Sequence, residues 1–223
     1  GYLDPALGGH HDQDRWDYKY LSKLTFRSDY QYDLNDVLYL NVGYTKGHFG
    51  DRLARSYYDI EKQRSFAHFS WEHHFSEINQ TTLHVYLNKE QNTDYLESER
   101  LATNYGSIDN PLAIDRSESA ERYELEFQHS YSPEQATRFA WGANSRINKA
   151  NSYHQYNTNK DITQRQHSLF INIEQRLNEK TLSNLGLMAE KTSSIDTKYS
   201  PRLSINRRLS RNQTLRLSAS RAY

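Results

Sequence analysis

The chain has 223 residues, of which 35% are hydrophobic and 13% aromatic, including 18 tyrosines. This aromatic share argues against a disordered chain, and the low hydrophobic share argues against a core that is covered on both sides. The 28 basic residues balance the 28 acidic ones, which disfavours a basic nucleic-acid binder, and the absence of cysteine excludes disulfides, thiol nucleophiles and cysteine-bound metals.

Apolar and polar residues alternate with a period of two, as they do in β-strands that have one wet face. The clearest run is Leu215 to Ser220, where the alternation has no exception, and Tyr123 to Gln128 follows the same pattern. In chain order the pattern predicts ten strands, at about 19–32, 37–46, 63–76, 81–92, 121–131, 136–147, 164–177, 181–191, 199–209 and 214–222.

Short polar turns such as Asp33 to Asp36 join these strands in pairs, and longer polar connections separate the pairs. The predicted hairpins cover about 19–46, 63–92, 121–147, 164–191 and 199–222, and the longer connections cover about 47–62, 93–120, 148–163 and 192–198. Short turns that alternate with long loops are typical of a transmembrane β-barrel, and strands of this length can cross a bilayer at a tilt. The predicted fold class is therefore all-β: an antiparallel up-and-down meander of about ten long strands, part of a transmembrane β-barrel.

Two motifs near the end of the chain point to a family. Residues Tyr199 to Asn206 contain Ser-Pro-Arg-Leu, and residues Thr214 to Tyr223 contain Thr-Leu-Arg and end in Arg-Ala-Tyr. In this order, on two strands joined by a short turn, they resemble the TonB-dependent outer-membrane receptors of Gram-negative bacteria. The turn and strand from Asp33 to Tyr44 are similar to the barrel hairpins of that family.

The resemblance implies a barrel of 22 strands with a plugged lumen, in the cell outer membrane of a Gram-negative bacterium. No plug domain is recognised in residues 1–223. We therefore expect the whole chain, 1–223, to be a partial β-barrel domain, an internal portion of a longer receptor.

The resemblance also implies a function, which is the active uptake of a scarce solute. An iron-siderophore or another metal chelate is expected first, and a cobalamin, a saccharide or a peptide remains an alternative. The expected partners are this small-molecule ligand, outer-membrane lipid and, through the full-length parent, the plug domain and the TonB complex. No nucleic acid, no cofactor and no enzyme activity is expected.

Aromatic residues in the predicted loops are the candidates for ligand contact, because an aromatic girdle at the strand ends does not explain them. They are Tyr95, Tyr105, Tyr153 and Tyr156. The sequence predicts no catalytic residue. Glu124 and Glu126 lie on one face of a strand, but the polar face of a barrel supplies such carboxylate pairs by chance.

Four histidines on two paired strands raise the question of a metal site. They are His68, His73, His74 and His84. A metal needs a convergent third ligand and supporting residues around it, which the pattern does not supply, so no metal ligand is predicted. His73 and His74 are instead interpreted, with Trp71, as rings at a membrane interface.

Two other classes of protein remain open at this stage. A closed ten-stranded outer-membrane barrel with hydrolase activity would have to pair strand 19–32 with strand 214–222. A soluble β-rich binding module is favoured by the mean hydropathy of −1.00, and it would bury the alternating apolar residues in one dry interior.

Overall fold

A computed structural model describes residues 19–53, 56–98 and 112–222 of the chain. Its strands are β1 (Lys19–Gln31), β2 (Asp36–Leu53), β3 (Ser56–Ser76), β4 (Asn79–Ser98), β5 (Leu112–Asp115), β6 (Glu118–Glu134), β7 (Thr137–Asn151), β8 (Ile162–Asn178), β9 (Thr181–Thr192), β10 (Lys198–Ser210) and β11 (Gln213–Ser220). A short helix, α2 (Tyr153–Tyr156), lies between β7 and β8. No helix of the described residues is long and apolar enough to cross a membrane.

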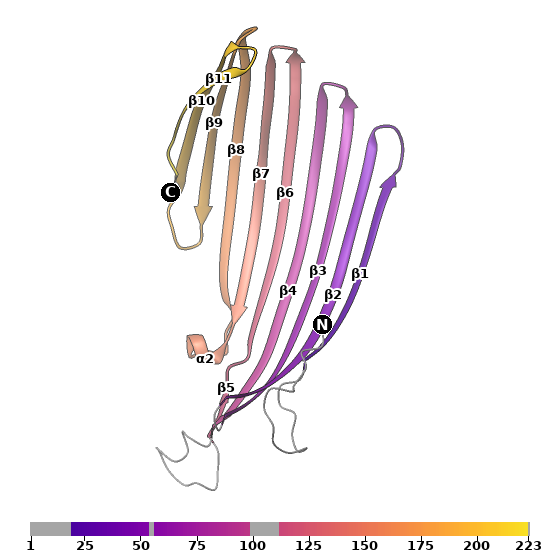
Figure 1. Cartoon of the computed structure of the whole chain (residues 1–223), viewed down its shortest axis with the longest axis vertical. Coiled ribbons are helices and arrows are strands. Elements are labelled where there is room, and N and C mark those ends of the chain that lie inside the picture. The colour runs from indigo at the N-terminus through magenta and orange to yellow at the C-terminus, as the bar shows by residue number, and fades with distance from the viewer. Residues whose placement is uncertain (1–18, 54–55, 99–111, 223) are drawn as a thin grey trace.

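The strands form one sheet in which chain neighbours are also spatial neighbours. The order is β1-β2-β3-β4-β6-β7-β8-β9-β10-β11, every pair is antiparallel, and the short β5 adds to β4 outside this path (Figure 1). The predicted fold class, an all-β antiparallel meander of long strands, is thereby confirmed.

Strands β1 and β11 lie at the two edges of the sheet (Figure 1). In the part of the chain that the structure describes, no ladder joins them. A closed ten-stranded barrel needs such a ladder, so the sheet does not have the architecture that the hydrolase alternative requires.

The two ends of the sheet differ in how the strands are joined. Connections of two to four residues follow β1, β3, β6, β8 and β10 at the end that we call the turn end, at the top of Figure 1. At the opposite end, the loop end, the connections after β4 and β7 are much longer, and the second of them contains α2. The short turns predicted from the sequence thus lie together at the turn end. The loop-end connections vary in length, since the one between β9 and β10 has five residues and the one between β2 and β3 is shorter still.

The predicted polar loop over 47–62 is wrong, because β2 continues to Leu53 and β3 begins at Ser56. The backbone ladder extends through polar residues, with His48 paired to Glu61. Side chains support this extension, since Glu61 accepts from Lys46 at 3.0 Å and from His48 at 3.1 Å. Polarity alone does not end a strand when its neighbour offers a partner for every backbone group.

The register divides the side chains into two faces. Residues that pair directly across strands point to the same side, so each strand contributes alternate residues to each face. One side, the apolar face, carries Phe26, Leu40, Phe69, Val85, Leu125, Ala143, Leu169, Leu187, Leu203 and Leu217. The other, the polar face, carries Arg27, Asn41, His68, His84, Glu124, Asn144, Ser168, Gly186, Arg202 and Arg216.

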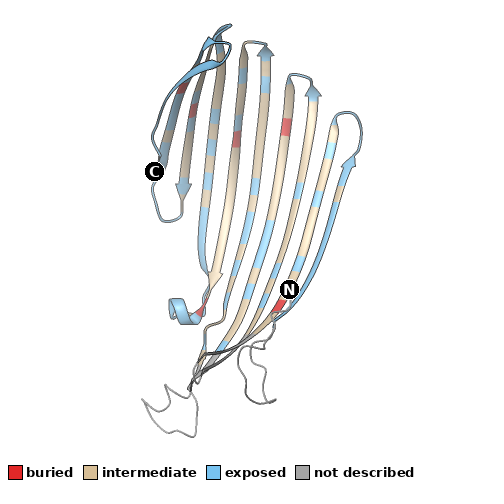
Figure 2. Cartoon of the chain, viewed as in Figure 1, coloured by how far each residue is buried: buried red, intermediate tan, exposed pale blue. Residues whose placement is uncertain are grey.

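No second layer covers the apolar face. Leu125 is 48% exposed, Leu169 is 64% exposed and Leu217 is 63% exposed, and no large side chain of the described residues is fully buried. Exposed and partly covered positions alternate in the middle of β8, whereas the edge strands β1 and β11 are exposed almost throughout (Figure 2). The apolar residues thus form an open band and not the dry interior that the soluble-module alternative requires.

The apolar band crosses the sheet on a diagonal. The row of paired residues that starts at Leu40 in β2 is still apolar at Leu125 in β6 but reaches His167 in β8. The row that starts at Leu217 in β11 reaches Gln175 in β8, eight residues nearer the turn end. A flat band meets different rows in successive strands when the strands are tilted and staggered, as they are in a barrel wall.

Glycines on the polar face leave room for aromatic rings of the neighbouring strand. Gly43 pairs with Phe66, and Gly142 pairs with Phe170. A Cβ atom at Gly142 would lie 2.3 Å from the backbone oxygen of Phe127 and 2.6 Å from the Phe170 ring. The ring therefore occupies the space over the glycine, which accounts for an otherwise unfavourable strand residue.

Candidate functional site

Ion pairs and hydrogen bonds connect neighbouring strands across the polar face. One half-buried pair joins Arg146 on β7 to Glu124 on β6, with nitrogen–oxygen distances of 2.6 and 2.9 Å. Asn144 also donates to Glu124, at 2.7 Å. The guanidinium partner gives Glu124 a structural role, since both carboxylate oxygens accept charge-assisted bonds.

A cluster of rings lies on the polar face of β2, β3 and β4. His68 stacks on Tyr86 with 4.3 Å between the ring centres, and its Nε2 lies 3.4 Å from Nδ1 of His84. Tyr39 meets His68 edge to face at 5.1 Å, and the Arg27 guanidinium lies 5.0 Å from the centre of the Tyr39 ring. The sequence indicated that His68 and His84 could meet, but the two tyrosines were not foreseen because their pairing depends on register.

At the loop end, the polar face holds a cavity of about 230 Å³ beside α2. It is lined by residues of β4, β6 and β7 together with Ser152, Gln155 and Tyr156. Gln155 donates to Glu118 on β6 at 2.8 Å, which ties α2 to the wall of the sheet. The cavity therefore combines carboxylate, amide and hydroxyl groups with one aromatic ring.

Local sequence explains why α2 forms and stops where it does. Ser152 is buried and caps the helix, its side chain accepting from the backbone nitrogen of Gln155 at 3.4 Å. Asn157 ends the helix in the left-handed conformation, with φ of 52°, and its backbone nitrogen donates to Tyr153 at 2.8 Å. Serine and asparagine are preferred at these two positions, so this turn is encoded locally.

The four predicted ligand-contact tyrosines have different positions. Tyr156 lines the cavity and is 42% exposed, while Tyr153, on the same helix, is 60% exposed. Tyr95 lies on β4 near the loop end and is 51% exposed. Tyr105 lies outside the described residues. The sequence missed Glu118 and Gln155, which follow from no motif because their contact spans 37 residues.

The segment between β5 and β6 is held by a compact set of polar contacts. Arg116 donates to Asp94 on β4 at 2.9 Å, and the Ser117 hydroxyl accepts from the backbone nitrogen of Asp94 at 3.2 Å. Hydrogen bonds from the side chain and the backbone of Ser117 lower the pKa of the Asp115 carboxyl below its usual value. A carboxylate that is stabilised in this way stays charged at neutral pH and fixes the turn.

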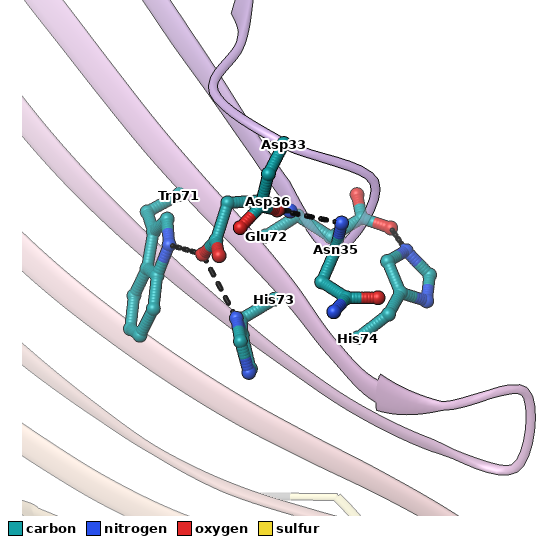
Figure 3. A network of polar contacts seen from close by, with 7 residues as sticks. All are labelled: Asp33, Asn35, Asp36, Trp71, Glu72, His73 and His74. Atoms are coloured by element: carbon teal, nitrogen blue, oxygen red, sulfur yellow. Dashed lines mark hydrogen bonds and ion pairs between the residues drawn. The ribbon is translucent and has the colours of Figure 1, made fainter.

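At the turn end, a second polar network lies across β2 and β3, and its central group is the Asp36 carboxylate on the apolar face. Trp71 donates to it at 2.6 Å, and Nδ1 of His73 lies 2.8 Å from the same oxygen (Figure 3). His74 points to the other face and lies 2.7 Å from Glu72. The interpretation of Trp71 and His73 as interfacial rings fits this position, at the turn-end border of the apolar band, but it does not fit His74, which lies on the opposite face.

Within the described ranges, no group of three histidine, aspartate or glutamate side chains converges so as to hold a metal ion. His73 and His74 face opposite sides, and their contacts are with Asp36 and Glu72.

Comparisons with known proteins address the fold. No protein-family model matches the sequence, and no curated protein matches it. Among solved structures, the ferric enterobactin receptor of Pseudomonas aeruginosa superposes with a TM-score of 0.73 at 12% identity, covering 92% of this chain and 33% of that chain. The siderophore receptor PirA of Pseudomonas aeruginosa gives 0.68 at 12% identity, covering 91% of this chain and 33% of that one.

A third solved structure, the copper transporter OprC, gives a TM-score of 0.62 at 12% identity and covers 91% of this chain and 36% of that one. The described sheet has the fold of part of the barrel wall in these solved structures. The predicted fold class, part of a transmembrane β-barrel, is therefore confirmed, and the chain spans about a third of the length of these receptor structures.

Proposed function

We propose that the chain is part of the barrel wall of an outer-membrane active transporter that takes up a scarce solute, an iron-siderophore or another metal chelate. The observation that carries this proposal is the single sheet with an apolar face and a polar face, in the fold shared with siderophore and copper receptors. Lipid cannot hydrogen-bond a backbone, so a sheet of this kind serves a membrane protein only as part of a closed barrel.

The proposed role of each face follows from its chemistry. The apolar face contacts lipid, and the polar face lines the lumen, where it meets water and the plug domain of the full-length parent. The connections at the loop end face the outside, where the ligand arrives. The barrel wall performs no covalent chemistry in this proposal, and inward passage depends on the TonB complex through the parent.

The cavity beside α2 is the proposed ligand-contact region within the described residues. Tyr156 offers a ring for stacking on a planar group, and Gln155 offers an amide beside it. Tyr153 is exposed near the same end and is proposed as a further contact. Tyr95 stays a proposed contact for a ligand at the rim, since its position on β4 belongs to the face opposite the cavity. Loops and short elements held by a rigid scaffold commonly supply such specificity.

Binding and uptake of a radiolabelled ferric siderophore test this proposal in cells that carry the full-length protein. Tyr156→Ala is expected to weaken binding by about three- to tenfold, the usual contribution of an aromatic contact. The matched control is Tyr32→Ala, which removes a ring that is 70% exposed at the turn end. At equal surface levels, equal binding by both variants and the unchanged protein would remove the cavity from the site.

A further inference from the structure

The apolar face contains a groove of about 440 Å³ on strands β6 to β9. Leu125 and Phe127 on β6 and Leu169 on β8 stand beside it, and the smaller Ala143 and Ala189 form its floor. Small residues between larger ones on neighbouring strands leave a hollow as wide as a strand. Its lining is nearly all hydrocarbon, so it suits an acyl chain.

Three cations border the groove and the apolar band toward the loop end. Lys149 is on β7, Arg165 on β8 and Lys191 on β9, and Lys191 also lines the groove. Arg165 pairs with Ile147, which lies two residues nearer the turn end than Lys149 on β7. Lys191 pairs with His167, which lies two residues nearer the turn end than Arg165 on β8. From β7 to β9, each charge therefore lies one row nearer the turn end than the one before it. The three charges run parallel to the diagonal of the apolar band.

Protein carboxylates neutralise these charges at most in part. In the described part of the chain, no ion pair includes Lys149, Arg165 or Lys191. Glu121, on the same face, lies directly opposite Lys149 in the ladder and forms its ion pair with Lys89, at 3.0 Å. Lys149 has its ammonium 5.9 Å from the centre of the Tyr123 ring.

We propose that this groove and these three cations bind a membrane lipid whose headgroup carries phosphate. The acyl chain lies along Ala143 and Ala189, and the phosphate lies among Lys149, Arg165 and Lys191. This rests on the proposed function only in that the apolar face lies in a membrane; it is independent of which solute is transported. Basic clusters at the border of a membrane-spanning surface recognise phosphorylated headgroups by charge, and the groove adds hydrophobic contact.

Native mass spectrometry of the full-length protein in neutral detergent measures the binding directly. The probes are dipalmitoyl phosphatidic acid and dipalmitoylglycerol, which differ only in the phosphate. We expect a retained phosphatidic acid and no retained dipalmitoylglycerol. Excess inorganic phosphate should compete weakly, because it lacks the chain; full displacement by free phosphate would mean an anion site without an acyl groove and would overturn the proposal.

The charge component is tested by the triple variant Lys149→Gln, Arg165→Gln and Lys191→Gln. A basic residue near an anionic headgroup contributes a factor of about five, so the three together predict roughly a hundredfold weaker binding. The control changes the same number of charges elsewhere, with Lys23→Gln, Lys62→Gln and Lys160→Gln. Equal loss in both triple variants would show a nonspecific charge effect and contradict the site.

The groove component is tested without changing charge. Ala143→Phe fills the floor of the groove and is expected to lower phosphatidic acid binding about tenfold, while resistance to unfolding by sodium dodecyl sulfate at room temperature reports that the barrel is intact. Unchanged lipid binding by an intact Ala143→Phe variant would refute the groove. Siderophore uptake should be preserved in the triple cation variant, so a failure of lipid binding and a failure of the transport proposal are distinguishable.

Discussion

The two faces of the sheet are made from the same strands and yet differ in almost every physical property. On β6, Leu125 and Phe127 contribute to the apolar face, while Glu124 and Glu126 contribute to the polar face. The polar face is held by pairs such as Arg146–Glu124, whereas much of the apolar face stands open. The alternation of apolar and polar residues along each strand, and not the mean hydropathy of −1.00, therefore determines whether this chain suits a bilayer.

The largest expected difference in folding free energy is between two variants that each place an arginine at neighbouring positions, one on each face. Leu125→Arg puts a guanidinium into the apolar band and is expected to cost about 2–4 kcal/mol of folding free energy in a bilayer. Glu126→Arg puts the same group on the polar face and is expected to cost much less. Urea titration of refolding into vesicles measures both values, and equal losses would mean that the faces are assigned wrongly.

The next largest effect concerns the contribution of the Arg146–Glu124 ion pair to the stability of the polar face. Arg146→Gln leaves the Glu124 carboxylate, whose side chain is 12% exposed, without its cation, and about 1–3 kcal/mol of stability should be lost. The double variant with Glu124→Gln should recover part of this loss, because no unpaired charge remains. A double-mutant cycle by the same titration measures the coupling, and additive losses would contradict a direct interaction.

Two glycines of the polar face should differ in their tolerance of a methyl group. Gly142→Ala brings a Cβ against the backbone oxygen of Phe127, which cannot move alone, so about 1–2 kcal/mol is expected to be lost. Gly43→Ala meets only the ring of Phe66, which can rotate, so its loss should be smaller. Thermal unfolding midpoints in detergent compare the two, and the reverse order would show that ring packing and not backbone contact limits these sites.

The smallest effect is expected at the turn end of the apolar face. Asp36→Asn keeps an acceptor for Trp71 but removes the charge beside His73, so about 0.5–1.5 kcal/mol should be lost. The matched change is Asp33→Asn, which keeps the turn acceptor of the nearby backbone nitrogens. Tryptophan fluorescence during urea unfolding reads the Trp71 environment, and identical curves for the two variants would show that the Asp36 network adds nothing to stability.

The sequence predicted the fold well because its main signal, a period of two, is local. The turns at Asp33 to Asp36 and Ser210 to Gln213 are encoded by polar residues at adjacent positions, and the structure places turns there. Strand ends at the loop end were wrong because continuation depends on the partner strand, as the pairing of His48 with Glu61 shows. The helix α2 was not predicted, although its Ser152 cap is a local signal in the sequence.

The candidate site was predicted less well than the fold. Tyr156 was named from its loop position, and the structure places it at a cavity. Its neighbours Glu118 and Glu90 come from strands β6 and β4, and only the exact register brings them together. Contacts of this kind cannot be read from spacing, because a register shift of one residue would turn each side chain to the opposite face.

The central claim is that alternate residues of one strand contact lipid and lumen. The chain has no cysteine of its own, so a single cysteine can be placed at each position from Thr81 to Asn88 of β4 and spin-labelled in a bilayer, in a full-length protein that carries no other cysteine. The account predicts high oxygen accessibility at Leu83, Val85 and Leu87 and low oxygen accessibility at Thr82, His84 and Tyr86, a period of two. A smooth profile, or one with the two sets exchanged, would contradict the account.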